Sequence, residues 1–542
     1  MKENQTKEEN STVIGIDLGT SNSLASYIKN GSPRIIPNER GERMTPSVVH
    51  FKENGDVIVG QMAKNQAVIN SDQTVSLVKL SMGTDKTYNI LNKTYSPVDI
   101  SSMILAYLKK SAETYLGYPV TKAVITVPAY FNDRQREDTL LAAQQAGLKV
   151  LKLLNEPIAA ALVYGFSNHK DTRLLVVDLG GGTLDISLIS YEDKVFRVRG
   201  VGGSTRIGGS NFDLLLVNKI MGEFKQIHGI DLHNDKIALQ QLLINAEKAK
   251  IDLSSANETQ ILIPYITVTP KGPIHLNVNL TRNDFEQLIA SVLKEIAEHI
   301  KHTFENASIS NSSTQHDSEN SSIENGSDNQ IPIKTIGYDW VDSVILVGGS
   351  TRLPVLESLV RQMVCSPKSE VYEEKFDKNL GNQLYNKDNM ALEKELKRNI
   401  HPDEAVARGA GLLAGILEGS IKDIEFHDIT AHDLGIEDDE GSFISVIPKG
   451  STYPLHVSHI VTNTMDNQES VLINVLQRMG MAEAESEDII SIGWFELAID
   501  SGKKKYESSI EVTFSIDSNG ILEVTALDID TGEQKAITIT NR

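Results

Sequence analysis

Residues 174–189 read LLVVDLGGGTLDISLI, and this stretch decides the fold. The apolar run Leu174–Val177 has the length and the β-branching of a buried strand, and the glycines at 180–182 predict a turn. Apolar and polar residues then alternate through 184–189, which predicts a second strand leaving the turn. The stretch is therefore a predicted hairpin with a bare backbone at its tip.

A turn without side chains lets several backbone N–H groups face one anion, and phosphate is well suited to such a nest. Asp178 and Asp185 flank this turn. Because carboxylates repel phosphate directly, they predict a divalent cation or a water between them and the phosphate. Taken alone, the motif leaves a plain glycine-rich hairpin as the alternative.

The same pattern occurs a second time near the start of the chain. Residues 13–28 read VIGIDLGTSNSLASYI, again an apolar strand, Asp-Leu-Gly, a turn of small residues and a second strand. Repetition of a whole supersecondary unit is strong evidence of architecture. The sequence thus predicts a duplicated α/β domain that holds one nucleotide between its halves.

Composition narrows the class of protein. The chain has 542 residues, a formal net charge of −21 and 40% apolar residues, which predicts three or four structural units. So negative a chain is a poor nucleic-acid binder. Its one cysteine, Cys365, excludes a disulfide framework or a thiolate metal cluster and is interpreted as an incidental thiol.

Two segments are predicted to lie outside the fold. Residues 1–12 are polar, lack the apolar core of a signal peptide and predict a disordered tail. Residues 308–330 are almost wholly Ser, Asn, Asp, Glu and Gln and predict a disordered surface insertion. No apolar run reaches membrane-spanning length, so we expect a cytoplasmic protein without a membrane partner.

Other segments supply candidate site residues. Lys79, between an apolar segment and a glycine turn, can reach a phosphate cleft, although a solvated surface lysine is the plainer interpretation. Glu156 precedes Pro157 at a predicted helix start, where it can simply serve the helix dipole. Residues 343–354, SVILVGGSTRLP, predict a buried strand and a glycine turn that can approach adenosine.

Periodicity predicts the remaining elements coarsely. Asn132 or Asp133 caps a helix that ends near Gly147, and residues 211–255 and 281–304 are helical, with β structure at 259–280 between them. Residues 401–415 form a helix of small residues suited to close packing.

At this point a family resemblance is apparent. IDLGTSNS, VVDLGGGTLDIS, LVGGSTRLP, VPAYFNDRQR, LNEPIAAALVYG and HPDEAVARGA closely resemble the Hsp70 (DnaK-like) chaperones and their short bacterial relatives of the HscC type. The resemblance covers 13–418 apart from the insertion and resumes at 427–540. It implies a two-lobed, actin-like ATPase domain of duplicated ribonuclease-H-like units at 13–420, a linker at 421–429 and a β-sandwich peptide-binding domain at 430–542.

The resemblance also implies a set of site residues. The residues that would hold the phosphates of ATP or ADP are Gly19, Thr20, Ser21, Gly180, Gly181, Gly182 and Thr183. Asp17, Asp178 and Asp185 would organise Mg²⁺, K⁺ and water. Lys79 and Glu156 would position the transferring phosphoryl group and its water, completing a catalytic set with Asp17, Asp178 and Thr183. The residues that would enclose adenosine and ribose are Glu247, Lys250, Ser254, Gly348, Gly349, Ser350, Arg352 and Asp403.

The implied function is that of a chaperone. ATP binding and hydrolysis would control the binding of extended hydrophobic segments of unfolded or client proteins. A J-domain cochaperone and an exchange factor are the implied partners. Lys152, in place of the family's Arg, and Asp428 fall where the family meets the J-domain, and Pro128 and Arg136 match its interdomain relay.

The predicted peptide groove lies in the second domain. In SVLINVL, residues 470–476, every second residue shares one face of a strand. By resemblance, Ile436, Val461, Val471 and Ile473 would line a pocket for one apolar side chain. The alternative is that this face is only sandwich core.

Three departures from the family's pattern bear on coupling. Leu80 stands where an Arg is common, and the Gln-Gly-Glu-Arg segment is replaced by residues 477–480, QRMG. The linker residues 424–428, IEFHD, include two polar positions. We expect weaker linker docking, because burying Glu425 without a partner costs free energy.

The chain ends at Arg542, directly after the β domain, which predicts no helical lid and faster peptide exchange. A non-hydrolysing, nucleotide-gated protein dedicated to one partner is the alternative function. The altered linker and the QRMG segment favour it, whereas the intact catalytic set favours turnover. A small-molecule kinase on the same fold would leave the β domain unexplained.

Overall fold

The computed structural model describes residues 13–168, 170–270, 272–309, 334–365, 395–396, 401–421, 425–478 and 489–538. The predicted tail, residues 310–330 of the predicted insertion, and Met479 and Gly480 lie outside these ranges, as does the side chain of Cys365.

The first lobe is built on a mixed sheet with strand order β11-β10-β1-β2-β3. Its strands are β1 (Val13–Asp17), β2 (Asn22–Lys29), β3 (Ser32–Ile36), β10 (Lys122–Val127) and β11 (Lys149–Asn155), with β4 (Thr45–Pro46) paired to β2. The strand β1 pairs antiparallel with β2 and parallel with β10. The predicted first hairpin is therefore β1–β2.

The second lobe repeats this topology. The strand β12 (Thr172–Leu179) pairs antiparallel with β13 (Leu184–Glu192) and parallel with β19 (Ser343–Val347). The sheet continues through β14 (Val195–Ser204) on one side and β20 (Glu395–Leu396) on the other. Matching strand pairings in both lobes confirm the predicted duplication.

Helices of small residues join the two sheets. Between them lie α4 (Glu156–Asn168) and α12 (Ala405–Leu417), whose buried alanines share a core with Leu174, Val176 and Val347. A Cβ on Gly409 would lie 1.9 Å from the carbonyl oxygen of Ala159, so the two helices approach as closely as backbones permit. The predicted small-residue helix thus holds the two lobes together.

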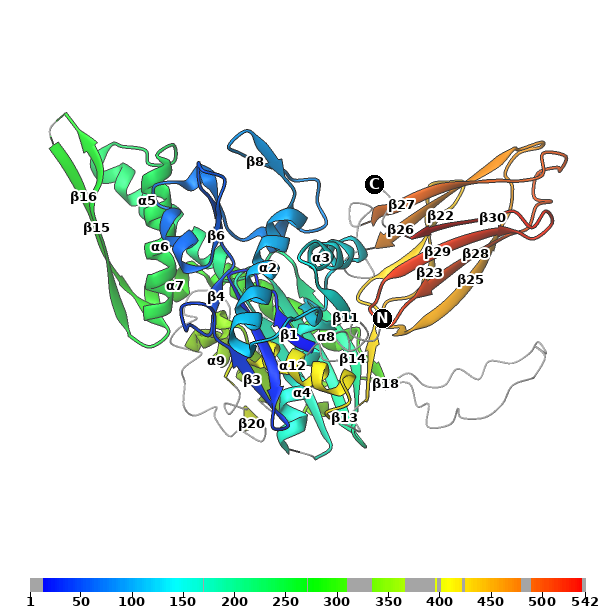
Figure 1. Cartoon of the computed structure of the whole chain (residues 1–542), viewed down its shortest axis with the longest axis horizontal. Helices are drawn as coiled ribbons and strands as arrows, with labels where there is room; N and C mark the ends of the chain where they lie inside the picture. Colours follow the sequence, from blue (N-terminus) through cyan, green and yellow to red (C-terminus); the bar gives the residue numbers. More distant parts are fainter. Residues whose placement is uncertain are drawn as a thin grey trace, which may run out of the picture.

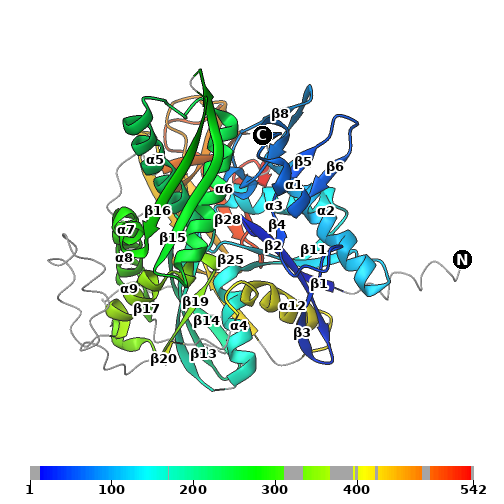
Figure 2. The same ribbon diagram turned by 90° about the vertical axis from the view of Figure 1, so that its left-hand side faces the viewer.

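Each lobe carries further elements around its sheet (Figure 2). The first lobe has β5 (Val49–Phe51), β6 (Val57–Val59), α1 (Gln61–Gln66), η1 (Ser71–Gln73), β7 (Thr74–Val75), η2 (Val78–Ser81), β8 (Tyr88–Ile90), β9 (Lys93–Tyr95), α2 (Pro97–Leu116) and α3 (Asp133–Gln145). The second lobe has α5 (Gly209–His228), α6 (Lys236–Leu253), β15 (Glu258–Thr269), β16 (Gly272–Thr281), α7 (Arg282–Leu288), α8 (Ala290–Glu305), η3 (Tyr338–Trp340), η4 (Gly349–Arg352) and α9 (Pro354–Cys365).

The C-terminal domain is an antiparallel β-sandwich with sheet orders β23-β22-β26-β27 and β25-β28-β29-β30. The first sheet comprises β22 (Asp433–Glu437), β23 (Phe443–Ile447), β26 (Ser470–Arg478) and β27 (Ile489–Ala498). The second comprises β25 (Leu455–Val461), β28 (Ile510–Ile516), β29 (Leu522–Asp528) and β30 (Gln534–Thr538). The sandwich lies beside α3 and β11, on the opposite side of the molecule from the β15–β16 hairpin (Figure 1).

Residues 425–429 of the predicted linker form a strand, and this overturns the expectation of a costly burial. Residues 422–424 lie outside the described ranges. The strand β21 (Glu425–Ile429) pairs parallel with β14 of the second lobe and antiparallel with β24 (Thr452–Tyr453) at the base of the sandwich. Glu425 and His427 point to solvent, whereas Asp428 and Ile429 are buried. Glu425 therefore pays no desolvation penalty in the docked strand.

The predicted insertion also begins differently from the expectation. Residues Ser308–Ile309 form β17, which pairs antiparallel with β18 (Lys334–Thr335). Backbone pairing with β18 thus extends ordered structure two residues into the polar segment, a contact that composition does not indicate.

Candidate active site

The tips of the two duplicated hairpins meet. A Cβ on Gly181 would lie 2.0 Å from Ser21 Oγ, and one on Gly182 would lie 2.9 Å from Thr20 Cγ2. A side chain at either position would displace the Ser21 hydroxyl or the Thr20 methyl group of the facing turn. The tip is also fixed from the second lobe, where Gly209 N donates to Gly180 O at 3.0 Å and Ser350 Oγ donates to the same oxygen at 2.9 Å.

Beside the tips lies a buried ion pair between the two residues whose roles the sequence left open. Lys79 is in η2 and Glu156 is the first residue of α4, and Lys79 Nζ lies 2.6 Å from Glu156 Oε1. Both side chains are at least nine-tenths buried. Burial alone would lower the pKa of Lys79, but the carboxylates of Glu156 and Asp17 outweigh it and raise that pKa. Lys79 is therefore no solvated surface lysine.

Three aspartates share this buried region. Asp17 ends β1, while Asp178 on β12 pairs across the ladder with Asp185 on β13. Burial, followed by repulsion from Glu156, raises the pKa of Asp17 to about 7, and the same causes raise the pKa of Asp185 to about 7. Burial likewise holds the pKa of Asp178 well above its ordinary value. Lys79 cannot balance so many carboxylates, so the region favours an added cation.

The aspartates differ in how their oxygens are satisfied. Thr126 Oγ1 donates to Asp17 Oδ1 at 3.4 Å, and Tyr130 N donates to Asp185 Oδ1 at 3.1 Å. The other oxygen of Asp185 is buried and has no hydrogen-bond partner among the described residues. Within the same residues, no three acidic, histidine or cysteine side chains converge as a directly ligated ion requires. A cation here would thus be held partly by water and phosphate.

Leu80, where the family commonly has Arg, packs onto the hairpin tip. A Cβ on Gly182 would lie 2.6 Å from Leu80 Cδ2, while the leucine side chain stays partly exposed. An apolar contact thus stands at the position where the sequence already departs from the family's common Arg.

Residues predicted to enclose adenosine line the second lobe. Lys250 Nζ bonds Asp213 Oδ2 at 2.7 Å and Gly209 O at 2.9 Å, and Arg352 bonds Asp403 at 2.5 Å. Ser254 Oγ donates to Lys250 O at 3.2 Å, within α6 and its C-cap. Gly348 has φ +82°, and a Cβ there would lie 2.6 Å from Asp178 Oδ1, so the glycine turn abuts the buried aspartates.

Two residues that contact the predicted site residues were not predicted from the sequence. Lys64 of α1 bonds Glu247 of α6 at 2.6 Å, which ties the lobes together over the site. Asp213 of α5 is mostly buried beside Lys250, and burial raises its pKa to about 6. Both pair with residues distant in the chain, so local sequence carries no signal for them.

The sandwich reaches this region through the linker. Asp428 Oδ2 accepts hydrogen bonds from Asn155 Nδ2 at 2.6 Å and from the Tyr453 hydroxyl at 2.8 Å. Asn155 precedes Glu156, and its Oδ1 accepts from Arg136 Nη2 at 2.9 Å. Arg136 also contacts Asn519 of the sandwich, whose side chain accepts from Leu153 N at 3.2 Å. The predicted relay residue Arg136 therefore lies at the domain boundary.

The profile of the Hsp70 protein family matches residues 13–316 and 386–542. This chain belongs to the Hsp70 family. Membership agrees with the two-lobed α/β domain and the β-sandwich, and it assigns a chaperone-type, nucleotide-binding function. No helix among the described residues is long and apolar enough to cross a membrane.

Other residues carried over from the Hsp70 pattern are placed as follows. Ile436, Val471 and Ile473 are buried in the sandwich core, and Val461 packs against them half-buried. Asp428 is buried at the domain boundary, while Lys152 Nζ lies 5.2 Å from the ring centroid of Phe426 in the linker strand. In this docked arrangement Ile436, Val471, Ile473 and the Asp428 side chain are buried.

Proposed function

We propose that this Hsp70 protein hydrolyses ATP with Mg²⁺ and K⁺ and uses the reaction to control its grip on extended apolar peptide segments. The observation that carries the proposal is the buried Lys79–Glu156 pair, 2.6 Å long, set among Asp17, Asp178 and Asp185 beside two touching glycine tips. Such a site combines anion-binding backbone with charged groups held in place before reaction.

Each residue of the site takes its proposed role in ATP hydrolysis from its position. Gly180, Gly181 and Gly182, with Thr20 and Ser21, present backbone and hydroxyl donors to phosphate from opposite sides. Lys79 supplies the fixed positive charge for the transferring phosphoryl group, and Glu156 holds Lys79 and orients the attacking water. Bound Mg²⁺ supplies charge neutralisation of the phosphates, and Asp178 and Asp185 would orient its water ligands.

Peptide binding is assigned to the sandwich. Ile436, Val461, Val471 and Ile473 lie together and supply one apolar pocket once the sandwich leaves the first lobe and its loops separate. Asp428, buried in the docked arrangement, would then become accessible to a J-domain cochaperone together with the half-buried Lys152. Unfolded chains are the clients that membership of the Hsp70 family suggests.

Single-turnover hydrolysis of ATP, with and without an extended peptide that carries a central leucine, tests the proposal. We expect slow hydrolysis that the peptide accelerates, and a loss of about 100-fold or more in Lys79→Ala with ATP still bound. Lys52→Ala, an exposed lysine of the same lobe, is the matched control. ATP binding without turnover in the wild type, or turnover indifferent to Lys79, would contradict the proposal.

A further inference from the structure

His432 of the C-terminal domain inserts its ring against the first lobe. It precedes β22, is 3% exposed, and its Nε2 lies 3.2 Å from the backbone oxygen of Tyr130. The two rings meet edge to face, with centroids 4.5 Å apart and planes at 72°. Since a carbonyl oxygen only accepts, Nε2 carries the proton and the imidazole donates.

Tyr130 connects this contact directly to the candidate active site. Its carbonyl accepts from His432, and its own N–H donates to Asp185 Oδ1 at 3.1 Å. Tyr130 lies in the short segment between β10 and α3, where no helix or strand holds it. A single backbone residue therefore separates the sandwich from a buried aspartate of the nucleotide site.

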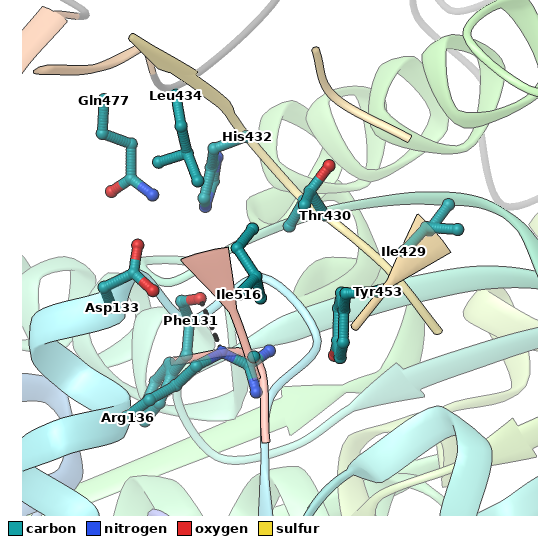
Figure 3. A pocket seen from close by; sticks show the side chains of 12 residues that line it. Phe131, Asp133, Arg136, Ile429, Thr430, His432, Leu434, Tyr453, Gln477 and Ile516 are labelled. Carbon is teal, nitrogen blue, oxygen red and sulfur yellow. Dashed lines mark hydrogen bonds between the residues drawn. The ribbon is translucent and has the colours of Figure 1, made fainter. Parts of the chain in front are cut away.

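The surroundings of His432 suit a neutral ring alone. Its Nδ1 is buried without a partner among the described residues, as is Gln477 Oε1 in the same pocket. Figure 3 shows His432 and Gln477 on one side of this pocket and Asp133 and Arg136 on the other. A protonated His432 would place a positive charge in this buried pocket with no acceptor for its Nδ1 proton in the described part of the chain, which costs free energy.

The charged groups around the ring include two cations. Lys449, in the turn between β23 and β24, holds Nζ 5.8 Å from the Tyr130 ring, and Arg136 of α3 is buried across the pocket. Asp433 of β22 also faces His432, but its carboxylate already accepts from Arg478 and from Lys449 N. Asp133 of α3 is the remaining acid of the pocket, opposite His432.

We propose that His432 is a positioning residue: in its neutral form it holds Tyr130, and through Tyr130 it orients Asp185, while the sandwich is docked. Protonation of His432 in mild acid releases the sandwich and removes this restraint. The consequence for hydrolysis rests on the proposed function, whereas the link from His432 to Asp185 does not.

The direction of the pKa shift of His432 agrees with a loss of docking in acid. Burial lowers the pKa of His432 to about 4 from 6.5, so docking is fully favoured above 6.5 and is progressively lost as the pH falls toward 4. Between about pH 7.5 and 6.0 the docking constant should fall about fourfold from this group. Asp133 acts oppositely, because burial raises its pKa to about 6 and its protonation favours docking. Comparing variants at each pH cancels the Asp133 contribution.

The test is amide hydrogen exchange of Tyr130 in the full chain without nucleotide, corrected for intrinsic exchange rates, in wild type and His432→Leu. We expect the variant to exchange several-fold faster at about pH 7.5, and the factor between them to shrink about fourfold at about pH 6.0. His432→Gln keeps an N–H donor without a titratable ring, so Tyr130 should be protected relative to His432→Leu by the same factor at both pH values. His456→Leu, an exposed histidine of the same sandwich, should match wild type.

Equal exchange in wild type and His432→Leu, or a factor between them that ignores pH, would overturn the proposal. Single-turnover hydrolysis by the same proteins gives the second readout: His432→Leu should raise the basal rate toward the peptide-stimulated rate, and His432→Gln should not. If the wild type hydrolyses no ATP, the proposed function fails, while Tyr130 exchange still decides the role of His432.

Discussion

Lys64 of the first lobe and Glu247 of the second lobe join their side chains at 2.6 Å, Nζ to Oε2, and so bridge the two lobes. Their side chains are 34% and 30% exposed, so the pair is neither fully solvated nor buried. Under the proposed function, in which a nucleotide is held between the lobes, its release would require this contact to open.

Lys64→Ala should therefore speed nucleotide release. A partly exposed pair contributes about 1 kcal/mol at most, which corresponds to an acceleration of about two- to fivefold. Stopped-flow release of a fluorescent ADP analogue measures it. Lys236→Ala is the control: it removes the salt bridge between Lys236 and Asp72, whose side chains are 67% and 75% exposed. This variant should release the nucleotide at the wild-type rate. Equal rates in Lys64→Ala and wild type would show that the contact does not limit opening.

Asp185→Asn should stabilise the nucleotide-free protein at neutral pH. Burial raises the pKa of Asp185 to about 7, above the ordinary 3.8, so its charge destabilises the folded state above pH 7 and has no such effect below about pH 4. The gain in Tm over wild type should thus be largest near pH 7.5 and shrink as the pH falls. Asp56→Asn, on an exposed turn, is the control. A gain that is independent of pH would contradict this assignment.

Tyr453→Phe should weaken docking of the sandwich without disturbing its core. The hydroxyl donates to buried Asp428, and losing a hydrogen bond to a charged group costs about 2 kcal/mol, or about 30-fold in the docking constant. Energy transfer between dyes at Lys110→Cys and Lys535→Cys, in a Cys365→Ser background, reports docking. Tyr506→Phe alters an exposed tyrosine of the same domain and should leave the transfer unchanged.

Gly181→Ala should reduce ATP affinity by about tenfold or more, because its Cβ would lie 2.0 Å from Ser21 Oγ and would push the hairpin tips apart. Isothermal titration measures the affinity. Gly222→Ala, at a position in α5 with open space around it, should bind ATP normally. Adding Ser21→Ala to Gly181→Ala removes the clashing oxygen and should restore part of the affinity. An unchanged ATP affinity in Gly181→Ala would show that the hairpin tips can accommodate a methyl group, and would contradict the prediction.

Local patterns predicted the duplicated hairpins and several helices, because strands, turns and caps depend on near neighbours, whereas the β-sandwich was implied by the family resemblance. The Asn132 cap is one case: its side chain accepts from Gln135 N, as the polar start of that helix indicated. The Lys79–Glu156 pair spans 77 positions and was reached through the family's pattern, since spacing alone left both residues with plainer roles. Lys64 with Glu247, and the backbone of Tyr130, depend on tertiary placement and had no local signal.

The linker was misjudged for a different reason. Glu425 and His427 alternate with Phe426 and Asp428, which is the period of a strand with one wet face. The polarity of Glu425 predicted a desolvation cost. The alternation of the strand instead places the Glu425 side chain in solvent, where no such cost arises.

The strand β21 pairs with β14, so the docked linker covers the backbone edge of β14. When the linker strand departs, the backbone N–H and C=O groups of Val195–Arg197 lose their cross-strand partners. A bare, regular edge of this kind invites pairing with any extended chain, including a second copy of this protein. Linker docking thus protects the second lobe against self-association, and the undocked protein should show a stronger tendency to oligomerise as its concentration rises.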